Sequence, residues 1–231
     1  MDGNLAFIGN ETHRRIVSNL LSKYERDRDI IGVLLEGSLA RGDAFPRSDV
    51  DLRVLLVDGG KQPFHTEIVE GVRLEVRFMD FHHSLSRLQE NAMDIYAYLD
   101  GRILHDPSGR LAELAQIARS RFAAYRASAD DRGRLAYWLT TAREKIVAAL
   151  DAKDLLKASF IATTSSWQVF EALWIVNDKP VPPAGTLLSH LKDLTLIPGD
   201  LDSLLRELLL GTSEDRPAAA INLMTWLVNR L

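Results

Sequence analysis

The chain has 231 residues, a mass of 25.9 kDa and no cysteine. This length is enough for one large domain or two small ones, and the lack of cysteine excludes disulfide scaffolds, zinc fingers and thiol catalysis. The 46% of hydrophobic and 26% of charged residues are typical of a globular protein that is neither disordered nor fibrous.

Charge and hydropathy limit the partners to be expected. The formal net charge is −4, the acidic excess lies before residue 110, and no basic stripe recommends nucleic acid as a partner. No apolar run approaches the ~18 residues that span a bilayer, and the first residues lack the pattern of a signal peptide. We therefore expect a cytoplasmic protein with no membrane partner.

The first half of the chain alternates between helical and strand patterns. An amphipathic helix is predicted over residues 10–28, where apolar residues recur at helical spacing behind a cap at Asn10 or Thr12. Short segments rich in Val, Leu or Ile follow and predict the strands of one mixed sheet: 30–37, 50–57, 64–70 and 72–79. A helix over 82–99 and an edge strand over 101–109 complete this part.

Strand patterns disappear after residue 110. Helical spacing and intervening Pro, Gly and Asp residues predict a series of helices: 111–126, 130–151, 153–177, 201–210 and 215–230. The change indicates an α+β chain of two domains, with a mixed sheet and flanking helices in residues 1–110 and a helical bundle in residues 111–231.

The most informative segment is residues 37–52, which reads GSLARGDAFPRSDVDL. Gly37 lies at the end of a predicted strand, where the absence of a Cβ lets an anionic ligand approach the backbone. Ser38 adds a hydroxyl beside the free amides of a helix start, and Arg41 could donate charge-assisted hydrogen bonds. We predict that these three residues form a phosphate site.

Two aspartates follow at a spacing of two. Because side chains alternate along a strand, Asp49 and Asp51 are expected on one face, with Val50 and Leu52 in the core. Like carboxylates repel each other unless a divalent cation lies between them, and oxygen ligands suit Mg²⁺. A solvated turn before a strand would explain an isolated pair equally well, but Gly37 and Ser38 upstream favour the metal site.

Taken together, G-S-x-A-R-G-D-x-x-x-x-S-D-x-D-L resembles the signature of the DNA polymerase β-type nucleotidyltransferase superfamily. The resemblance implies transfer of a nucleotidyl group from a nucleoside triphosphate to a hydroxyl, with pyrophosphate as leaving group. It also implies Mg²⁺ held by Asp49, Asp51 and a third carboxylate on a later strand. ATP is the expected co-substrate.

Glu75 is the candidate for that third carboxylate. In the segment 72–79 it lies on the polar face of the predicted strand, where pairing with a neighbouring arginine is the alternative explanation. If the preceding hairpin turns about Gly71, Glu67 lies opposite Glu75 and could contact a cationic substrate. A slip of one residue would place Glu67 on the other face.

Residues 64–111 are similar in order and spacing to the corresponding part of the kanamycin, or aminoglycoside, nucleotidyltransferases. That resemblance implies a small-molecule hydroxyl acceptor, an aminoglycoside-like antibiotic, and a homodimer. It also implies that Glu171, in the Phe170-Glu171 pair, is the general base in cis or across the dimer. Trp167, Phe170 and Trp174 would desolvate this carboxylate, which suits a base near neutrality.

Other functions stay open at this stage. Small antitoxin-like modules that bind or modify a protein partner contain a similar motif. The long helical extension of this chain argues against that function. Template-independent RNA tailing would need a basic track, which the charge distribution does not supply. The six histidines have no ligand spacing and are expected to be structural or surface residues.

Overall fold

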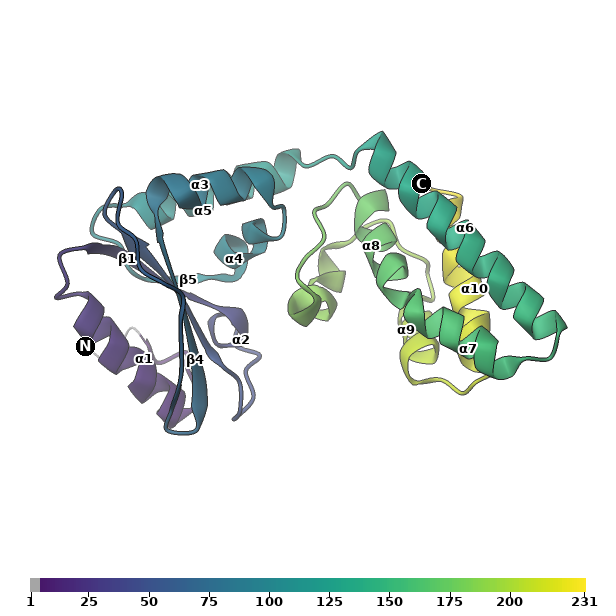
Figure 1. The fold of residues 1–231 in the computed structure, drawn as a ribbon, viewed down its shortest axis with the longest axis horizontal. Helices are drawn as coiled ribbons and strands as arrows, with labels where there is room; N and C mark the ends of the chain where they lie inside the picture. The colour runs from purple at the N-terminus through teal and green to yellow at the C-terminus, as the bar shows by residue number, and fades with distance from the viewer. Residues whose placement is uncertain (1–4) are drawn as a thin grey trace. The chain divides into compact units, whose positions relative to one another are not determined.

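A computed structural model describes residues 5–231 and divides the chain into two compact units, one ending at Ala124 and the other Tyr125–Leu231 (Figure 1). The first unit contains a mixed sheet with helices, and the second is helical, which confirms the predicted α+β class. Within the described range, none of the helices combines the length and the hydropathy needed to cross a membrane.

The sheet of the first unit has the strand order β3-β4-β2-β1-β5. Its strands are β1 (Ile30–Glu36), β2 (Val50–Leu56), β3 (His65–Val69), β4 (Val72–Asp80) and β5 (Arg102–His105). β2 and β4 are parallel, whereas the other neighbours are antiparallel. All five predicted strands are present, and β5 is shorter than predicted and lies at the edge.

One face of the sheet packs against α1 (Glu11–Tyr24). This helix begins where predicted, because the Asn10 side chain accepts a hydrogen bond from the His13 amide at 3.1 Å. Ile16 and Val17 of α1 share a buried core with Leu52 of β2 and Leu74 of β4. The core therefore takes alternate residues of each strand and leaves the others to the opposite face.

The opposite face carries α3 (Phe81–Glu90), α4 (Asp94–Asp100) and α5 (Arg110–Ala124). The single helix predicted over 82–99 is two, because Asn91 interrupts it and its side chain accepts from the Met93 amide at 3.0 Å. Leu111 and Leu114 of α5 are fully buried in this core. The division therefore falls after Ala124, not after residue 110 as predicted.

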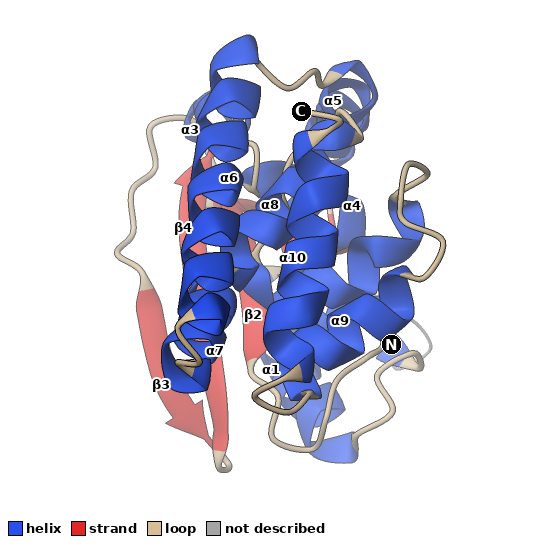
Figure 2. Ribbon diagram, turned by 90° about the vertical axis from the view of Figure 1, so that its right-hand side faces the viewer, coloured by secondary structure: helices blue, strands red, loops and turns tan. Residues whose placement is uncertain are grey.

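The second unit contains helices alone, and the strands, red in Figure 2, belong to the first unit. Its elements are α6 (Ala129–Asp151), α7 (Leu155–Thr164), α8 (Ser166–Val176), the 3-10 helix η2 (Ala184–Asp193), α9 (Leu201–Leu210) and α10 (Asp215–Val228). The helix predicted over 153–177 is broken at Ser165, which ends α7 and precedes α8.

Candidate active site

A short strand-to-helix junction forms the predicted phosphate site. β1 ends at Glu36, and α2 (Gly37–Arg41) begins with the glycine in a left-handed conformation at φ +70°. The positive φ favours glycine here, and a Cβ at this position would also displace the Asp51 carboxylate. The side chain of Glu36 does not cap α2. Ser38 and the first amides of α2 are thus placed where an anion can approach.

Arg41 lies at the other end of α2. Its guanidinium is 3.1 Å from Asp43 and 3.9 Å from Asp100, and its side chain is only 14% exposed. These contacts hold the guanidinium against Asp43 and Asp100. A phosphate bound by Arg41 would have to share the cation with these carboxylates.

The predicted carboxylates Asp51 and Glu75 are brought together by the parallel pairing of β2 with β4, in which they are direct partners. Asp49 directly precedes β2. Burial raises the pKa of Asp51 to about 6, with further contributions from Glu36, Glu75 and Asp49. The repulsion among these carboxylates is what a bound cation would relieve.

The donor chemistry of this site fits a divalent cation, since carboxylate oxygens are the ligands that Mg²⁺ prefers. Over residues 5–231, however, the side chains as they stand do not converge into a metal-binding group of three or more ligands. Glu75 also lies 3.9 Å from Arg73, as the alternative explanation of a strand ion pair anticipated. Asp51 and Glu75 are the residues that could hold the ion, with Asp49 beside them.

The predicted position of Glu67 is wrong. In the hairpin of β3 with β4, Thr66 is the partner of Glu75, and Glu67 is the partner of Leu74. Leu74 belongs to the core on the α1 side. The one-residue difference in register therefore puts Glu67 on the opposite face of the sheet from Asp51 and Glu75, because successive residues of a strand point to opposite faces.

His13 is a residue of this site that sequence reasoning missed. It is fully buried, and its Nε2 lies 2.9 Å from the carbonyl oxygen of Ser48, the residue before Asp49. The imidazole thus ties α1 to the loop that carries Asp49. Its place on an amphipathic helix gave no signal of this role.

Arg53 is a second residue that sequence reasoning missed. Its side chain is 2% exposed and contacts Glu36 and Asp94, the latter at 3.7 Å. An arginine inside the otherwise apolar segment LRVLL, residues 52–56 of β2, was the available signal.

Glu171 lies on α8 of the second unit. Its Oε1 accepts a hydrogen bond of 2.6 Å from Nη2 of Arg134 on α6, and this bond is the main cause that raises the pKa of Arg134. Phe170 and Trp174 beside it are buried. The carboxylate therefore has a cationic partner in addition to the predicted aromatic neighbours.

Comparison with known proteins agrees with this geometry. Residues 13–98 match the family described as a nucleotidyltransferase domain. No curated protein matches the chain. A solved structure of a nucleotidyltransferase-like protein from Exiguobacterium sibiricum 255-15 is 14% identical, with a TM-score of 0.43 over 95% of this chain and 74% of that chain, a likeness too weak for inference.

The first unit therefore contains a nucleotidyltransferase domain. Such a domain supports the transfer of nucleotides and implies a nucleoside triphosphate as a substrate.

Proposed function

We propose that the protein transfers a nucleoside monophosphate, AMP from Mg-ATP, to a hydroxyl of a small molecule. The observation that carries this proposal is the contact of the Gly37 junction with Asp51, which in turn pairs with Glu75. An anion-accepting backbone and a crowded carboxylate pair thus adjoin each other. This is the arrangement that a metal-bound triphosphate requires.

In the proposed reaction, Gly37, Ser38 and Arg41 hold the β- and γ-phosphates. Asp49, Asp51 and Glu75 would hold Mg²⁺, which would supply neutralisation of the charge on the transferring and leaving oxygens. The acceptor oxygen bonds to the α-phosphorus as the bond to the bridging oxygen breaks and pyrophosphate leaves. Glu171 takes the acceptor proton, in cis or from the other subunit of a homodimer.

The chemical class of the acceptor was expected from the family resemblance alone. The resemblance to aminoglycoside nucleotidyltransferases made an antibiotic of that kind the expected acceptor, attracted by Glu67, Glu75 and Glu171. Glu67 faces the other side of the sheet, which removes one carboxylate from that argument. Modification of an aminoglycoside stays a prediction to be tested against other hydroxyl compounds.

The test is pyrophosphate release with Mg-ATP over a panel of aminoglycosides, lincosamides and acidic hydroxyl compounds. Release that depends on an acceptor is expected. Asp49→Asn and Asp51→Asn should each lower the rate about a thousandfold, because the metal site supplies several kcal/mol and each 1.36 kcal/mol is tenfold.

Retained turnover in these variants would refute the metal assignment. Silence over the whole panel with ATP still bound would refute a small-molecule acceptor and favour a protein partner.

A further inference from the structure

The sheet face that carries Asp51 and Glu75 changes character along β2 and β4. Since the two strands are parallel and in register, three cross-strand pairs follow one another on this face at intervals of two residues: Asp51 with Glu75, Arg53 with Arg77, and Leu55 with Met79. An interval of two residues is about 7 Å along a strand. An acidic pair, an arginine pair and an apolar pair thus lie in a row.

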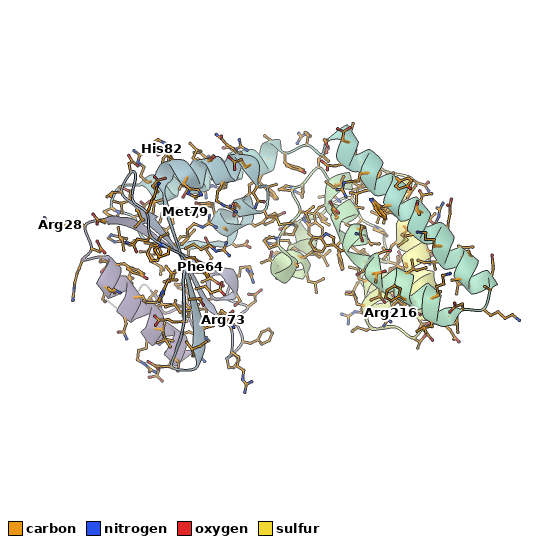
Figure 3. All side chains as sticks on the ribbon, in the orientation of Figure 1. Arg28, Phe64, Arg73, Met79, His82 and Arg216 are labelled. Carbon is orange, nitrogen blue, oxygen red and sulfur yellow. The ribbon has the colours of Figure 1, made fainter. Side chains whose placement is uncertain are left out.

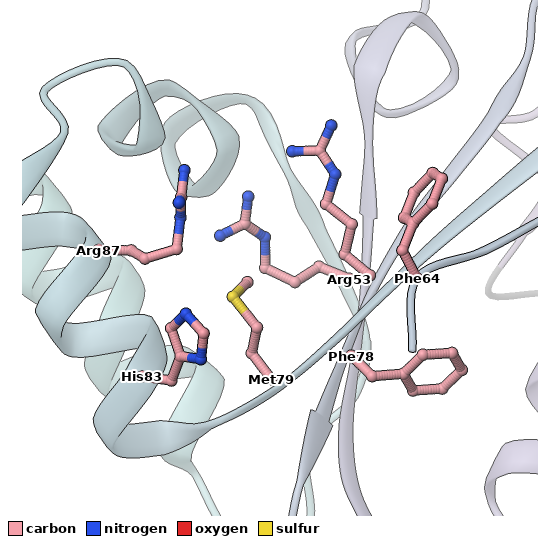
Figure 4. Close-up of a pocket in the computed structure, with 7 residues that line it drawn as sticks. Arg53, Phe64, Phe78, Met79, His83 and Arg87 are labelled. Atoms are coloured by element: carbon pink, nitrogen blue, oxygen red, sulfur yellow. The ribbon is translucent and has the colours of Figure 1, made fainter. Parts of the chain in front are cut away.

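A pocket of about 320 Å³ opens over the second and third pairs. Its walls include Arg53, Arg77 and Met79 from the sheet, Phe64 from the segment before β3, and His83 and Arg87 from α3. Figure 4 shows His83 and Arg87 on one side and Phe64 on the other. None of the lining residues is acidic.

The counter-ions of these arginines do not line the pocket. Asp94 is 2.7 Å from Arg87 and 3.7 Å from Arg53, and Glu36 contacts Arg53. Two carboxylates therefore face three arginines. Arg77 is exposed, and within residues 5–231 the structure gives it no ion-pair partner. The pocket thus has more arginines than carboxylates among these contacts. The exposed guanidinium of Arg77, whose charge also acts on Asp51, can bind an anion.

The position of the pocket assigns it to the acceptor. The Gly37 junction lies beside the first residues of β2, since Glu36 pairs with Asp51, whereas the pocket lies at Arg53 and beyond. The acidic pair separates the two. In an in-line displacement the acceptor approaches the phosphorus opposite the leaving pyrophosphate, and if the pyrophosphate occupies the junction, the acceptor comes from the pocket side.

We propose that this pocket binds an anionic group, a carboxylate or a phosphate, on an acceptor whose hydroxyl reaches the carboxylates. The proposal rests on the proposed nucleotidyl transfer and names its substrate class. Arg77 and Arg87 bind the anionic group, and Phe64 and Met79 contact an apolar body. The site then selects an acidic acceptor over a polycationic one such as an aminoglycoside.

Three compounds of one shape test the proposal: 4-(hydroxymethyl)benzoate, neutral benzyl alcohol and cationic 4-(aminomethyl)benzyl alcohol. Their binding to the full chain is measured by calorimetry with Mg²⁺ and a non-hydrolysable ATP analogue. The benzoate should bind most tightly, and Arg77→Gln should weaken it about tenfold, as expected for one charge-assisted hydrogen bond.

Arg73→Gln is the matched control. It removes the same charge from the same face of β4, but Arg73 lies near the β3–β4 turn and Met79 toward the other end of the strand (Figure 3). Arg73 does not line the pocket. Its substitution should leave benzoate binding unchanged.

Several results would overturn the pocket assignment. One is benzoate binding that is absent or no tighter than that of the neutral and cationic compounds. A second is an equal loss of benzoate affinity in Arg73→Gln and Arg77→Gln. A third is weaker binding of the ATP analogue in Arg77→Gln with benzoate binding unaffected. The last would give the pocket to the nucleotide. Benzoate binding without pyrophosphate release from any acceptor would support the anion site and refute nucleotidyl transfer, so the two failures are distinguishable.

Discussion

The acidic and the arginine pairs of the β2–β4 face lie two residues apart, and the protein compensates their charge differently. Arg53 is buried against Glu36 and Asp94. Asp51 is surrounded mainly by other carboxylates, and its raised pKa of about 6 records their repulsion together with its burial. The arginine has its counter-ions in the fold, whereas for the aspartate the only opposing charge among the contributions to its pKa is that of Arg77, the smallest of them. A charge that the fold leaves uncompensated is where a ligand is expected to act.

Replacement of Arg53, whose charge is compensated by Glu36 and Asp94, should have the largest effect on stability. Arg53→Leu leaves the carboxylates of Glu36 and Asp94 without their shared buried partner, and we expect a loss of about 3–5 kcal/mol in the free energy of unfolding. Urea denaturation measures it. Arg73→Leu is the control, because Arg73 is 55% exposed, and its loss should stay under about 0.5 kcal/mol. Similar losses in both variants would contradict the view that the buried ion pairs of Arg53 stabilise the fold more than the exposed Arg73 does.

The second unit offers another acid paired with arginine. Glu171→Gln should lower turnover about a hundredfold, the lower range for a general base, while ATP binding is spared. Pyrophosphate release and calorimetry with ATP separate the two effects. Arg134→Gln removes the partner and keeps the carboxylate, so it should retain more activity than Glu171→Gln. An unchanged rate in Glu171→Gln would eliminate this carboxylate as the base.

The uncompensated aspartate predicts a pH dependence of stability. Because the pKa of Asp51 is raised in the folded protein to about 6, its protonated form stabilises the fold below pH 4, and this contribution is lost as the pH rises through 6. Asp51→Asn should therefore be more stable than the parent at pH 7 by on the order of 1 kcal/mol, discounted for partial exposure, and not at pH 4.

Thermal unfolding at both pH values checks this prediction. Asp58→Asn, an exposed aspartate after β2, serves as the control and should show no such gap. A stability difference for Asp51→Asn that is the same at pH 4 and pH 7 would show that the charge of Asp51 is not its cause.

The smallest effect is expected at Glu67. Glu67→Gln should leave pyrophosphate release unchanged, because this carboxylate lies on the α1 side, while the same change at Glu75 should abolish most of it. The steady-state rates of pyrophosphate release in Glu67→Gln and Glu75→Gln test this prediction. Equal losses would mean that the register of the β3–β4 hairpin does not separate their roles.

Local sequence predicted much of the site. Strand alternation was enough to place Asp51 and Glu75 on one polar face, and the glycine followed by serine was enough to predict the junction after β1. The caps and apolar spacing predicted α1, and the five strands appear in the predicted order along the chain. Each of these features depends on a few neighbouring residues, so it can be predicted from a single segment of the sequence.

Pairing and packing over long distances were decided only by the tertiary structure. The hairpin register placed Glu67 opposite Leu74. A shift of one residue moves every side chain of the strand to the other face of the sheet, and the local sequence does not specify that shift. Burial of Leu111 and Leu114 assigned α5 to the first unit. The arginine pocket likewise joins β2, β4 and α3, segments separate in sequence. Thus the sequence by itself determined most of the elements, the polar sides of β2 and β4 and the chemistry of the motif. The register of the hairpin, the unit division and the pocket depended on contacts that no single segment contains.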